Sequence, residues 1–547
     1  MKPSDMGLLF DEAAARGHAT VVHLDRPFDL APDGGTRWTV PELATLVATT
    51  AARLAAAGAG RGDRVAVVKE NHWDYDLLAC AAVRAGAVPA QLSAALDPAV
   101  LAALLTRLRP TVLITSAAVL ERCRAAGTDP AALAGICLTV GAEARDVEAP
   151  GAEARGADAP GVGAPGVRPL ADIEPGPPVH RARHDDEPLV INHTSGTTGV
   201  PKLVTHSTRT IIRKLARFEA VPYPGIGVRR GDTLLHAGSY AHGRTFCWTA
   251  VAFSRAPEAV VLLSGAAPDA VDPLLRAHPP TIVEALPSVY VRFQGLTRRL
   301  DNPFRRVRLY ISTYDAVHPP TLRAYLHASR RTRPVWMQGW GQTETGPLTF
   351  RFHTRTATDA ARSTARDLGR PIPFKTRLRV VDPRTRMPLP RGSTGLLQAR
   401  TAALALGYVG EEDRWADKHH DGWWNTGDLG VLRRDGSVRL LDREVDSPGG
   451  LSCLETEDLL EVRLPEALEC VVLGRPDGKD PIPVVVTPDG QLDPARWDTA
   501  AAGLPLAEPT VLTWDEVPRT GTGKVRRSAL LEQLTGDAGT CGTGRWT

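Results

Sequence analysis

Hydrophobic positions in the first part of the chain switch repeatedly between helical and strand spacing. Residues 40–60 are apolar at helical intervals and end at Gly58 and Gly60, which predicts a helix. The β-branched run at 63–68 follows a Gly-Asp turn and predicts a strand. The pattern continues with expected helices at 74–86 and 98–108 and expected strands at 87–93 and 111–116. This alternation predicts α/β layers around a largely parallel sheet.

The later part of the chain predicts two further regions. Strand and helix patterns resume after residue 188, and residues 375–441 are rich in strands and glycine turns, which indicates a β subdomain. The last hundred residues show strand, helix and strand patterns. We therefore expect a large N-terminal domain, residues 1–441, of layered α/β subdomains plus a β subdomain. A small α+β C-terminal domain, residues 442–547, would follow it.

Residues 141–188 interrupt this alternation. They consist mainly of Gly, Ala and Pro with scattered charges and contain few large apolar residues. Such a stretch buries too little surface to offset its ordering entropy, so we expect a low-complexity, mobile surface loop.

Composition excludes several classes of protein. Lys and Arg number 65 against 62 Asp and Glu, so no excess of positive charge favours nucleic acid as a partner. Seven scattered cysteines without a C-x-x-C pair indicate neither a disulfide framework nor a zinc site. Apolar stretches end well before the roughly 20 residues that a membrane span needs. The first thirty residues contain no signal-peptide pattern, and we expect a cytoplasmic protein without a membrane partner.

A hydroxyl- and glycine-rich loop follows the strand expected near residue 190. Backbone N–H groups, hydroxyls and an ammonium can together hold a polyphosphate, and glycines let the backbone approach it. The spacing differs from a Walker A loop, and a glycine-rich surface turn is the structural alternative. The candidate phosphate-binding residues are Thr194, Ser195, Gly196, Thr197, Thr198, Gly199 and Lys202.

A second motif surrounds a tryptophan between glycines. Trp340, next to Gly341, can lie flat against a planar base. Thr343 can donate to a phosphate, and Glu344 offers a hard oxygen ligand for magnesium. The structural alternative is a tryptophan packed under a turn.

Three further residues complete the candidate chemistry. Asp428 follows a Thr-Gly turn and can accept both hydroxyls of a ribose, although an Asp after Gly is often only a turn residue. Arg443 comes directly after an expected strand. Lys524 lies in a glycine-flexed loop and can bring positive charge to a developing oxyanion, unless this segment is only a solvated basic tail.

The order of these motifs carries more information than any one of them. TSGTTGVPK, GWGQTETG, NTGDL, DRE and PRTGTGK, in this order, resemble the adenylate-forming superfamily of acyl-CoA synthetases, adenylation domains of nonribosomal peptide synthetases and beetle luciferases. The resemblance extends from about residue 35 to 535. It implies attack of a carboxylate on the α-phosphate of MgATP, which gives an acyl-adenylate and pyrophosphate. It also implies that the small C-terminal domain is a mobile lid.

The resemblance assigns roles residue by residue. The 194–202 loop would hold the β- and γ-phosphates, and Trp340 would lie against adenine. Thr343 would contact the α-phosphate, and Glu344 would bind Mg²⁺. The ribose would be bound by Asp428 and Arg443. Lys524 would bridge the carboxylate and the α-phosphate.

Two departures from the family pattern bear on the second half of the reaction. After Arg443 the loop is short and has no lysine, which argues against CoA or a carrier protein as the acceptor. From Ser312 through Thr313 and Tyr314 to Asp315 the family commonly has Ser-Gly-Gly-Ala, and Tyr314 would fill space that glycine leaves for substrate. His242 and Gly243 resemble the pocket-gating position, although a core histidine is equally expected there. Arg244 is a candidate partner for a substrate anion.

The sequence therefore predicts an ATP-dependent, AMP-forming ligase for a small or aromatic carboxylic acid. The acyl group would pass to a thiol of CoA or a carrier protein, or to an amine. One alternative is a member of the same superfamily that activates nitrite for N–N bond formation. Another is a non-catalytic nucleotide-binding homologue, against which the intact Lys202, Glu344, Asp428 and Lys524 argue.

Overall fold

The chain forms two compact units in the computed structural model. The structure describes residues 5–145, 166–194, 200–265, 267–359, 365–443, 453–475 and 479–536. The first unit comprises Met1–Leu274 with Ala403–Trp415, and the second comprises Leu275–Ala402 with Ala416–Thr547. No helix in the described part of the chain is long and apolar enough to span a membrane.

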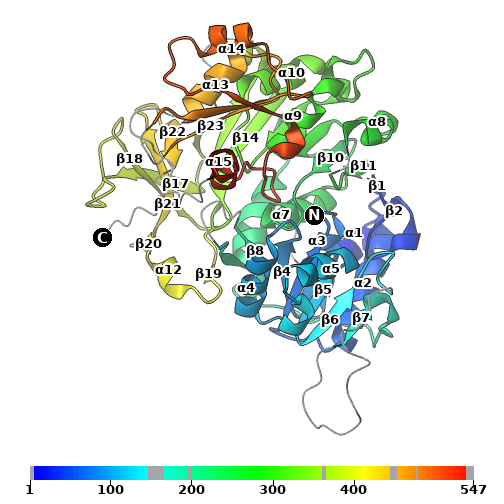
Figure 1. Ribbon diagram of the computed structural model, residues 1–547. Coiled ribbons are helices and arrows are strands. Elements are labelled where there is room, and N and C mark those ends of the chain that lie inside the picture. The colour runs from blue at the N-terminus through cyan, green and yellow to red at the C-terminus, as the bar shows by residue number, and fades with distance from the viewer. Residues whose placement is uncertain are drawn as a thin grey trace. The chain divides into compact units, whose positions relative to one another are not determined.

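The described helices and strands follow the alternation that the sequence predicts (Figure 1). The helices are α1 (Leu9–Ala15), α2 (Val40–Ala56), α3 (Asp74–Arg84), α4 (Pro98–Leu108), α5 (Ala117–Ala125), α6 (Arg217–Glu219), α7 (Gly243–Arg255), α8 (Pro268–Ala277), α9 (Pro287–Phe293), α10 (Pro319–Ala328), α11 (Arg355–Asp359), α12 (Glu412–Ala416), α13 (Cys453–Arg463), α14 (Pro494–Ala501) and α15 (Arg527–Thr535). The strands are β1 (Val21–Leu24), β2 (Arg37–Thr39), β3 (Arg64–Lys69), β4 (Val88–Ser93), β5 (Val112–Thr115), β6 (Ile136–Thr139), β7 (Val167–Pro169), β8 (Pro188–His193), β9 (Leu203–Ser207), β10 (Thr233–Ala237), β11 (Ala259–Leu262), β12 (Ile282–Ala285), β13 (Leu309–Ser312), β14 (Val335–Gln342), β15 (Gly346–His353), β16 (Arg370–Pro371), β17 (Thr376–Val381), β18 (Thr394–Thr401), β19 (Gly407–Tyr408), β20 (His419–His420), β21 (Trp423–Leu432), β22 (Val438–Arg443), β23 (Glu469–Leu473), β24 (Ile482–Val486) and β25 (Thr510–Leu512).

Local chemistry sets the ends of the helix predicted at 40–60. Helix α2 begins after Thr39, whose side chain forms a capping box with Glu42, and Pro41 occupies the first turn. It ends at Ala56, and Gly58 then adopts a φ of 95°, which side chains disfavour.

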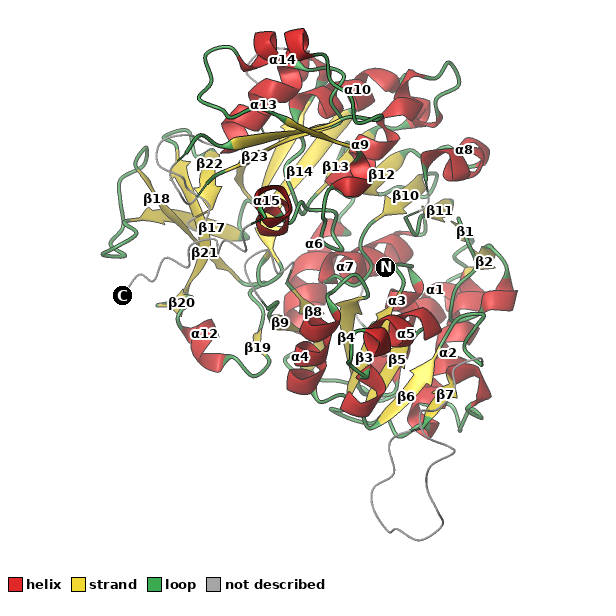
Figure 2. Ribbon diagram, viewed as in Figure 1, coloured by secondary structure: helices red, strands yellow, loops and turns green. Residues whose placement is uncertain are grey.

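The first unit contains two sheets whose cores are parallel. One has the strand order β19-β9-β8-β4-β3-β5-β6-β7, in which the strands from β8 to β7 run parallel to one another and β9 pairs antiparallel with β8. Leucines of α4 and residues of α5 pack on one face of it in a continuous apolar cluster, and α3 contacts β3 and β4 (Figure 2). The other sheet has the order β10-β11-β1-β2. Loops at the carboxyl ends of such parallel strands are the usual place for ligands.

One strand lies where the sequence predicted a loop. Within the 141–188 segment, β7 pairs with β6 through Val167 and Cys137, and Leu170 is buried. Residues 146–165 of this segment lie outside the described residues. The expectation of a loop was therefore too broad at its C-terminal end, because a three-residue edge strand needs only one apolar side chain and leaves almost no periodic signal.

The second unit contains three sheets. Strands β12, β13 and β14 run parallel, and β15 and β16 extend that sheet antiparallel. Strands β17, β18, β21, β20 and β22 form the antiparallel β subdomain expected at 375–441. Strands β23, β24 and β25 form a small sheet with two apolar clusters of its own, one including Trp497 of α14 and the other including Leu530 of α15.

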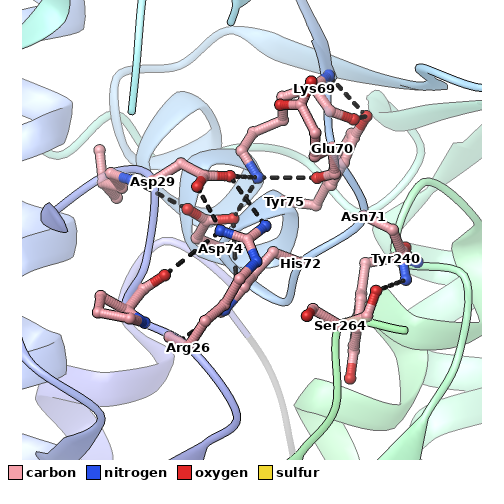
Figure 3. Close-up of polar contacts among 12 residues, drawn as sticks. Arg26, Asp29, Lys69, Glu70, Asn71, His72, Asp74, Tyr75, Tyr240 and Ser264 are labelled. Atoms are coloured by element: carbon pink, nitrogen blue, oxygen red, sulfur yellow. Dashed lines mark hydrogen bonds and ion pairs between the residues drawn. The ribbon is translucent and has the colours of Figure 1, made fainter. Parts of the chain in front are cut away.

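A fully buried lysine organises the turn between β3 and α3 in the first unit. The Lys69 ammonium donates to Asp74 Oδ1 at 2.8 Å and to the Glu70 carbonyl at 2.9 Å, and it forms an ion pair with Asp29 (Figure 3). Its three N–H donors therefore have three acceptors. Burial by itself would raise the pKa of Asp29, but the charges of Lys69 and Arg26 lower it to about 2. The stability that this lowered pKa contributes is complete above about pH 4 and is lost as the pH falls towards 2.

We expect Asp74→Ala to destabilise the protein by about 3–5 kcal/mol, because it removes one of the two carboxylates that pair with the buried Lys69 ammonium. It also removes the acceptor of the Leu30 N–H, 2.9 Å from Asp74 Oδ2. The free energy of unfolding in urea measures this. Asp33→Ala, at an exposed position, is the control and should change it by less than about 0.5 kcal/mol. Equal effects of the two substitutions would contradict the importance of the ion cluster.

Candidate functional site

The base of the predicted phosphate loop is closed by hydrogen bonds in the first unit. β8 ends at His193 and β9 begins at Leu203, and the two strands pair antiparallel. The Thr194 N–H donates to the Lys202 carbonyl at 3.0 Å, and the Lys202 N–H donates to Thr194 Oγ1 at 3.1 Å. Ser195, Gly196, Thr197, Thr198 and Gly199 lie outside the described residues. Thr194 and Lys202 thus face each other where the loop leaves the sheet.

His193 ties this loop base to the neighbouring strand, a role that the sequence analysis missed. Its Nε2 accepts the Ser93 N–H at 3.1 Å, and its Nδ1 donates to the Thr194 carbonyl at 2.8 Å. These two partners require the neutral tautomer with the proton on Nδ1. Burial also lowers the pKa of His193 to about 4. His193 therefore holds the loop in place and does not act as an acid or base. Its only sequence signal is its position directly before Thr194.

The candidate substrate residues His242, Gly243 and Arg244 lie at the beginning of α7, also in the first unit. His242 is buried, and its ring lies 4.7 Å from that of His193 between centroids. Gly243 is required by close packing, since a Cβ there would lie 2.7 Å from Asn192 Oδ1. Arg244 pairs with Glu219 at 2.6 Å, so its charge has a carboxylate partner within the protein.

A chain of buried polar side chains supports this segment from below. The Asn192 amide donates to Gln91 Oε1 at 2.9 Å, and the Gln91 amide donates to Asp76 Oδ1 at 2.9 Å. Thr249 of α7 donates to Asp76 Oδ2 at 2.7 Å. Burial raises the pKa of Asp76 to about 7, against these hydrogen bonds. This series of hydrogen-bonded side chains connects α3, β4, β8 and α7 next to Gly243.

The tryptophan motif forms the tip of the β14–β15 hairpin in the second unit. Gly341 sits at a register shift, and a Cβ there would lie only 2.1 Å from the Gly346 carbonyl oxygen, so only glycine fits. Glu344 is buried at 6% exposure. Trp340 is half-buried and packs against the apolar cluster of the β subdomain. Thr343, also half-buried, lies between Trp340 and Glu344 at the tip.

Gln342 connects the tryptophan motif to the predicted ribose site. Its Nε2 donates to the Thr426 carbonyl at 2.6 Å, and its Oε1 accepts the Trp424 indole N–H at 2.9 Å. Asp428, two residues beyond Thr426, is the direct cross-strand neighbour of Arg443. Three motifs that are distant in sequence therefore lie together within the second unit. Gln342 was not among the predicted site residues, although it lies inside the motif.

Lys524 lies in a short, braced hairpin loop of the second unit. The Thr520 N–H donates to the Lys524 carbonyl at 2.8 Å, and the Lys524 N–H donates to Thr520 Oγ1 at 3.2 Å. Arg519 stacks over the Trp514 ring at 3.7 Å. Gly523 has a φ of 77°, and a Cβ there would collide with Ser288 of α9. The loop that presents Lys524 is thus held by its own residues.

Tyr314 stands in a strained backbone conformation just after β13. Its φ of 79° lies in the left-handed region, where a side chain costs about 1–2 kcal/mol. This is the position where the sequence analysis noted a departure from glycine. The Thr313 methyl group would lie 3.2 Å from a Cβ on Gly339, which places this loop beside the start of the tryptophan motif. Asp315 follows on the exposed side.

Comparison with known proteins places this geometry in context. The AMP-binding enzyme family matches residues 10–409. The chain is 40% identical over 538 residues, 97% of this chain and 96% of the relative, to a 3-amino-2-hydroxy-4-methoxybenzoate diazotase of Streptomyces cremeus. It is 29% identical to a 3-aminoavenalumate diazotase of a Streptomyces species, over 66% of this chain and 72% of the relative.

A solved structure with a similar fold is the anthranilate CoA ligase AuaEII in complex with anthranoyl-AMP. The TM-score is 0.75 at 20% identity, over 97% of this chain and 98% of that chain. This likeness confirms the predicted mixed α/β architecture with a small C-terminal domain.

We expect Gln342→Leu to raise the KM for ATP by about 5- to 30-fold. The substitution removes the hydrogen bonds that join the tryptophan motif to the strand of Asp428, a loss of about 1–2 kcal/mol. Steady-state kinetics with varied ATP measure the change. Gln294→Leu, outside these motifs, is the control, and its Oε1 accepts from Thr321. An unchanged KM for ATP in Gln342→Leu would contradict the role of this tie.

Proposed function

Because this chain belongs to the AMP-binding enzyme family, we propose that it is an ATP-dependent diazotase. It would activate nitrite as a nitrosyl adenylate and transfer the nitroso group to the amino group of an aminobenzoate. The family membership confirms the predicted AMP-forming ligase and its use of ATP. The substrates are the part that we propose.

The observation that carries the proposal is the extent of the match to a diazotase. Identity of 40% extends over 97% of this chain, and so includes the C-terminal region with Lys524. Matches to CoA ligases, such as the 3-hydroxybenzoate–CoA ligase of Aromatoleum, are 28% identical and cover 62% of this chain. The short, lysine-free loop after Arg443 also favours an acceptor other than CoA.

The residues present suit a magnesium–nucleotide complex. Thr194 and Lys202 would hold phosphates in the first unit. In the second unit, Asp428 and Arg443 would bind the ribose, since their strands pair at these residues. The described residues contain no group of three or more His, Cys, Asp or Glu side chains arranged to hold a metal. Mg²⁺ would therefore arrive with the phosphates and take Glu344 as a protein ligand, where it would neutralise phosphate charge.

The proposed reaction has two steps. A nitrite oxygen attacks the α-phosphorus of ATP, the bond to pyrophosphate breaks, and the nitrosyl adenylate forms. The lone pair of the aryl amine then attacks the nitrosyl nitrogen, and AMP leaves with one nitrite oxygen. The amine loses a proton, and the N-nitroso product rearranges to a diazohydroxide, which loses its remaining oxygen as water after protonation. The product is the aryl diazonium ion.

The protein's contribution is charge compensation and position. Nitrite and the triphosphate are both anions, so their approach requires cations and hydrogen-bond donors arranged in advance. Lys524 would supply one ammonium to the α-phosphate and nitrite. The acceptor loop, residues 238–243, would hold the aromatic amine, with Gly243 packed closely against Asn192. Tyr314 would narrow the space available to the activated anion.

The acyl-adenylate alternative makes a different product from the same nucleotide chemistry. An aromatic acid would release pyrophosphate without nitrite and would pass to CoA, a carrier protein or an amine. The same assay decides between the two.

We expect nitrite to trigger pyrophosphate release by the wild-type protein with MgATP, and 3-amino-2-hydroxybenzoate to yield a diazo product detected by absorbance and mass. Lys524→Ala should lower the rate of nitrite-dependent pyrophosphate formation about 30- to 1,000-fold, a loss of about 2–4 kcal/mol of transition-state stabilisation. The exposed Lys479→Ala is the matched control. Pyrophosphate release that requires an aromatic acid and ignores nitrite would refute the proposal in favour of acid activation.

We expect Tyr314→Gly to raise the free energy of unfolding by about 1 kcal/mol, because glycine adopts a φ of 79° without strain. It should also allow pyrophosphate release with benzoate, because it removes the ring proposed to narrow the site. Tyr314→Ala separates the two effects, since it removes the ring but keeps the strained Cβ. If neither substitution changes the range of activated anions, Tyr314 does not limit the site.

A further inference from the structure

We propose that Asn71 is a positioning residue for the acceptor loop, residues 238–243, and thereby sets the affinity for the aromatic amine. The proposal rests on the proposed function insofar as this loop holds the amine. Asn71 lies in the turn between β3 and α3, about 170 residues away from the loop in sequence, and it is not among the predicted site residues.

The Asn71 carboxamide uses both of its ends on the backbone of two other loops. Its Oδ1 accepts the Tyr240 N–H at 2.8 Å. Its Nδ2 donates to the Gly238 carbonyl at 3.0 Å and to the Ser264 carbonyl at 3.1 Å (Figure 3). Gly238 and Tyr240 follow β10, and Ser264 follows β11. One side chain thus replaces the hydrogen bonds that three backbone groups lose where the sheet ends.

The turn that carries Asn71 is itself immobilised. Lys69, at the end of β3, is completely buried and pairs with Asp29 and Asp74. The hydroxyl of Tyr75 accepts the Lys69 N–H at 2.9 Å. Asn71 therefore projects from a backbone fixed on both sides, with the ion cluster on one side and the acceptor loop on the other (Figure 3).

Asn71 holds backbone groups of the acceptor loop, whereas other contacts hold its side chains. Gly238 has no side chain, and a Cβ there would collide with His236 at 2.5 Å. The Tyr240 ring is anchored through its hydroxyl near the carbonyls of His236 and Leu263, at 3.1 and 3.2 Å. Further along, Thr245 Oγ1 donates to the His242 carbonyl at 2.8 Å, and the Asn192 amide donates to the Ala241 carbonyl at 3.5 Å, so Asn71 holds the beginning of the loop. Removal of the carboxamide would loosen the loop at Gly238 and Tyr240 without removing any group that contacts a substrate.

The nucleotide-binding segments are held by different contacts. In the first unit, the hydrogen bonds that fix the base of the phosphate loop join Ser93, His193, Thr194 and Lys202, and Asn71 takes no part in them. A displaced acceptor loop should therefore affect the amine and leave ATP unaffected. A purely structural loss would instead lower stability and affect both substrates alike.

The test compares Asn71→Ala with the wild type and with Glu70→Gln, a control in the same turn whose Oε1 accepts from Ser116. We expect Asn71→Ala to raise the KM for 3-amino-2-hydroxybenzoate about 10- to 100-fold, because small displacements of a binding group are costly. The KM for ATP and the rate of nitrite-dependent pyrophosphate release without amine should stay within about twofold. Glu70→Gln should change none of these values.

Two further measurements keep the outcome decisive. Hydrogen exchange should show faster exchange of the Tyr240 amide and of residues 238–243 in Asn71→Ala, with the phosphate-loop base unchanged. Asn71→Asp has nearly the same shape and keeps the oxygen that accepts the Tyr240 N–H. It replaces the donor nitrogen by an oxygen that faces the Gly238 and Ser264 carbonyls. It should fold if Asn71→Ala does not, and it should also raise the KM for the amine.

The failure of this inference differs from that of the proposed function. If the wild type forms no diazo product, the proposed function fails, and exchange at 238–243 in Asn71→Ala still decides whether Asn71 positions the loop. The inference is overturned if exchange in the loop is unchanged, or if the KM values for ATP and the amine rise together.

Discussion

The completely buried ammonium group of Lys69 is the interaction on which the local structure of the first unit depends. Lys69 carries that charge at the end of a central parallel strand, and its three N–H groups are all used by Asp29, Asp74 and the Glu70 carbonyl. A buried ammonium is tolerated only with such complete compensation. The geometry of its partners therefore fixes the segment after β1, the β3–α3 turn and, through Asn71, the loop after β10.

The same principle recurs wherever a candidate site residue leaves a strand. Loops at the carboxyl ends of strands lack ladder partners, and three of the candidate segments are each held here by one polar side chain of the same unit. His193 holds the base of the phosphate loop, Asn71 holds the acceptor loop, and Gln342 joins the tryptophan motif to the strand of Asp428. Catalysis between two anions depends on position more than on any reactive side chain, so these ties determine what the motif residues can do.

The charges around the acceptor loop agree with the view that these side chains position other groups and do not react themselves. Burial keeps His193 neutral, with both ring nitrogens engaged, and Arg244 is paired with Glu219. Neither residue is arranged as a general acid or base. The chemistry proposed here requires none, because the amine attacks an already activated nitrosyl group and its proton can leave to solvent.

Much of the candidate site was predictable from local sequence. Hydrophobic spacing located α2 to α4 and β3 to β5, and the order of motifs predicted the candidate nucleotide-binding residues, including Asp428 and Arg443. Their direct pairing across β21 and β22 appeared only in the structure. Tyr314 was recognised as a departure from glycine, but its φ of 79°, and thus its strain, could not be deduced from residue identity.

By itself, the sequence determined which chemical groups are present and which local element carries each, since periodicity and loop composition act over a few residues. Tertiary structure alone decided the partners: that Asn71 would reach the backbone of a loop about 170 residues later, that Gln342 would span two motifs, and that β7 would join a sheet from a low-complexity segment. Hydrogen bonds of this kind depend on distances between segments that meet only when the strands assemble. No local pattern in the chain encodes them.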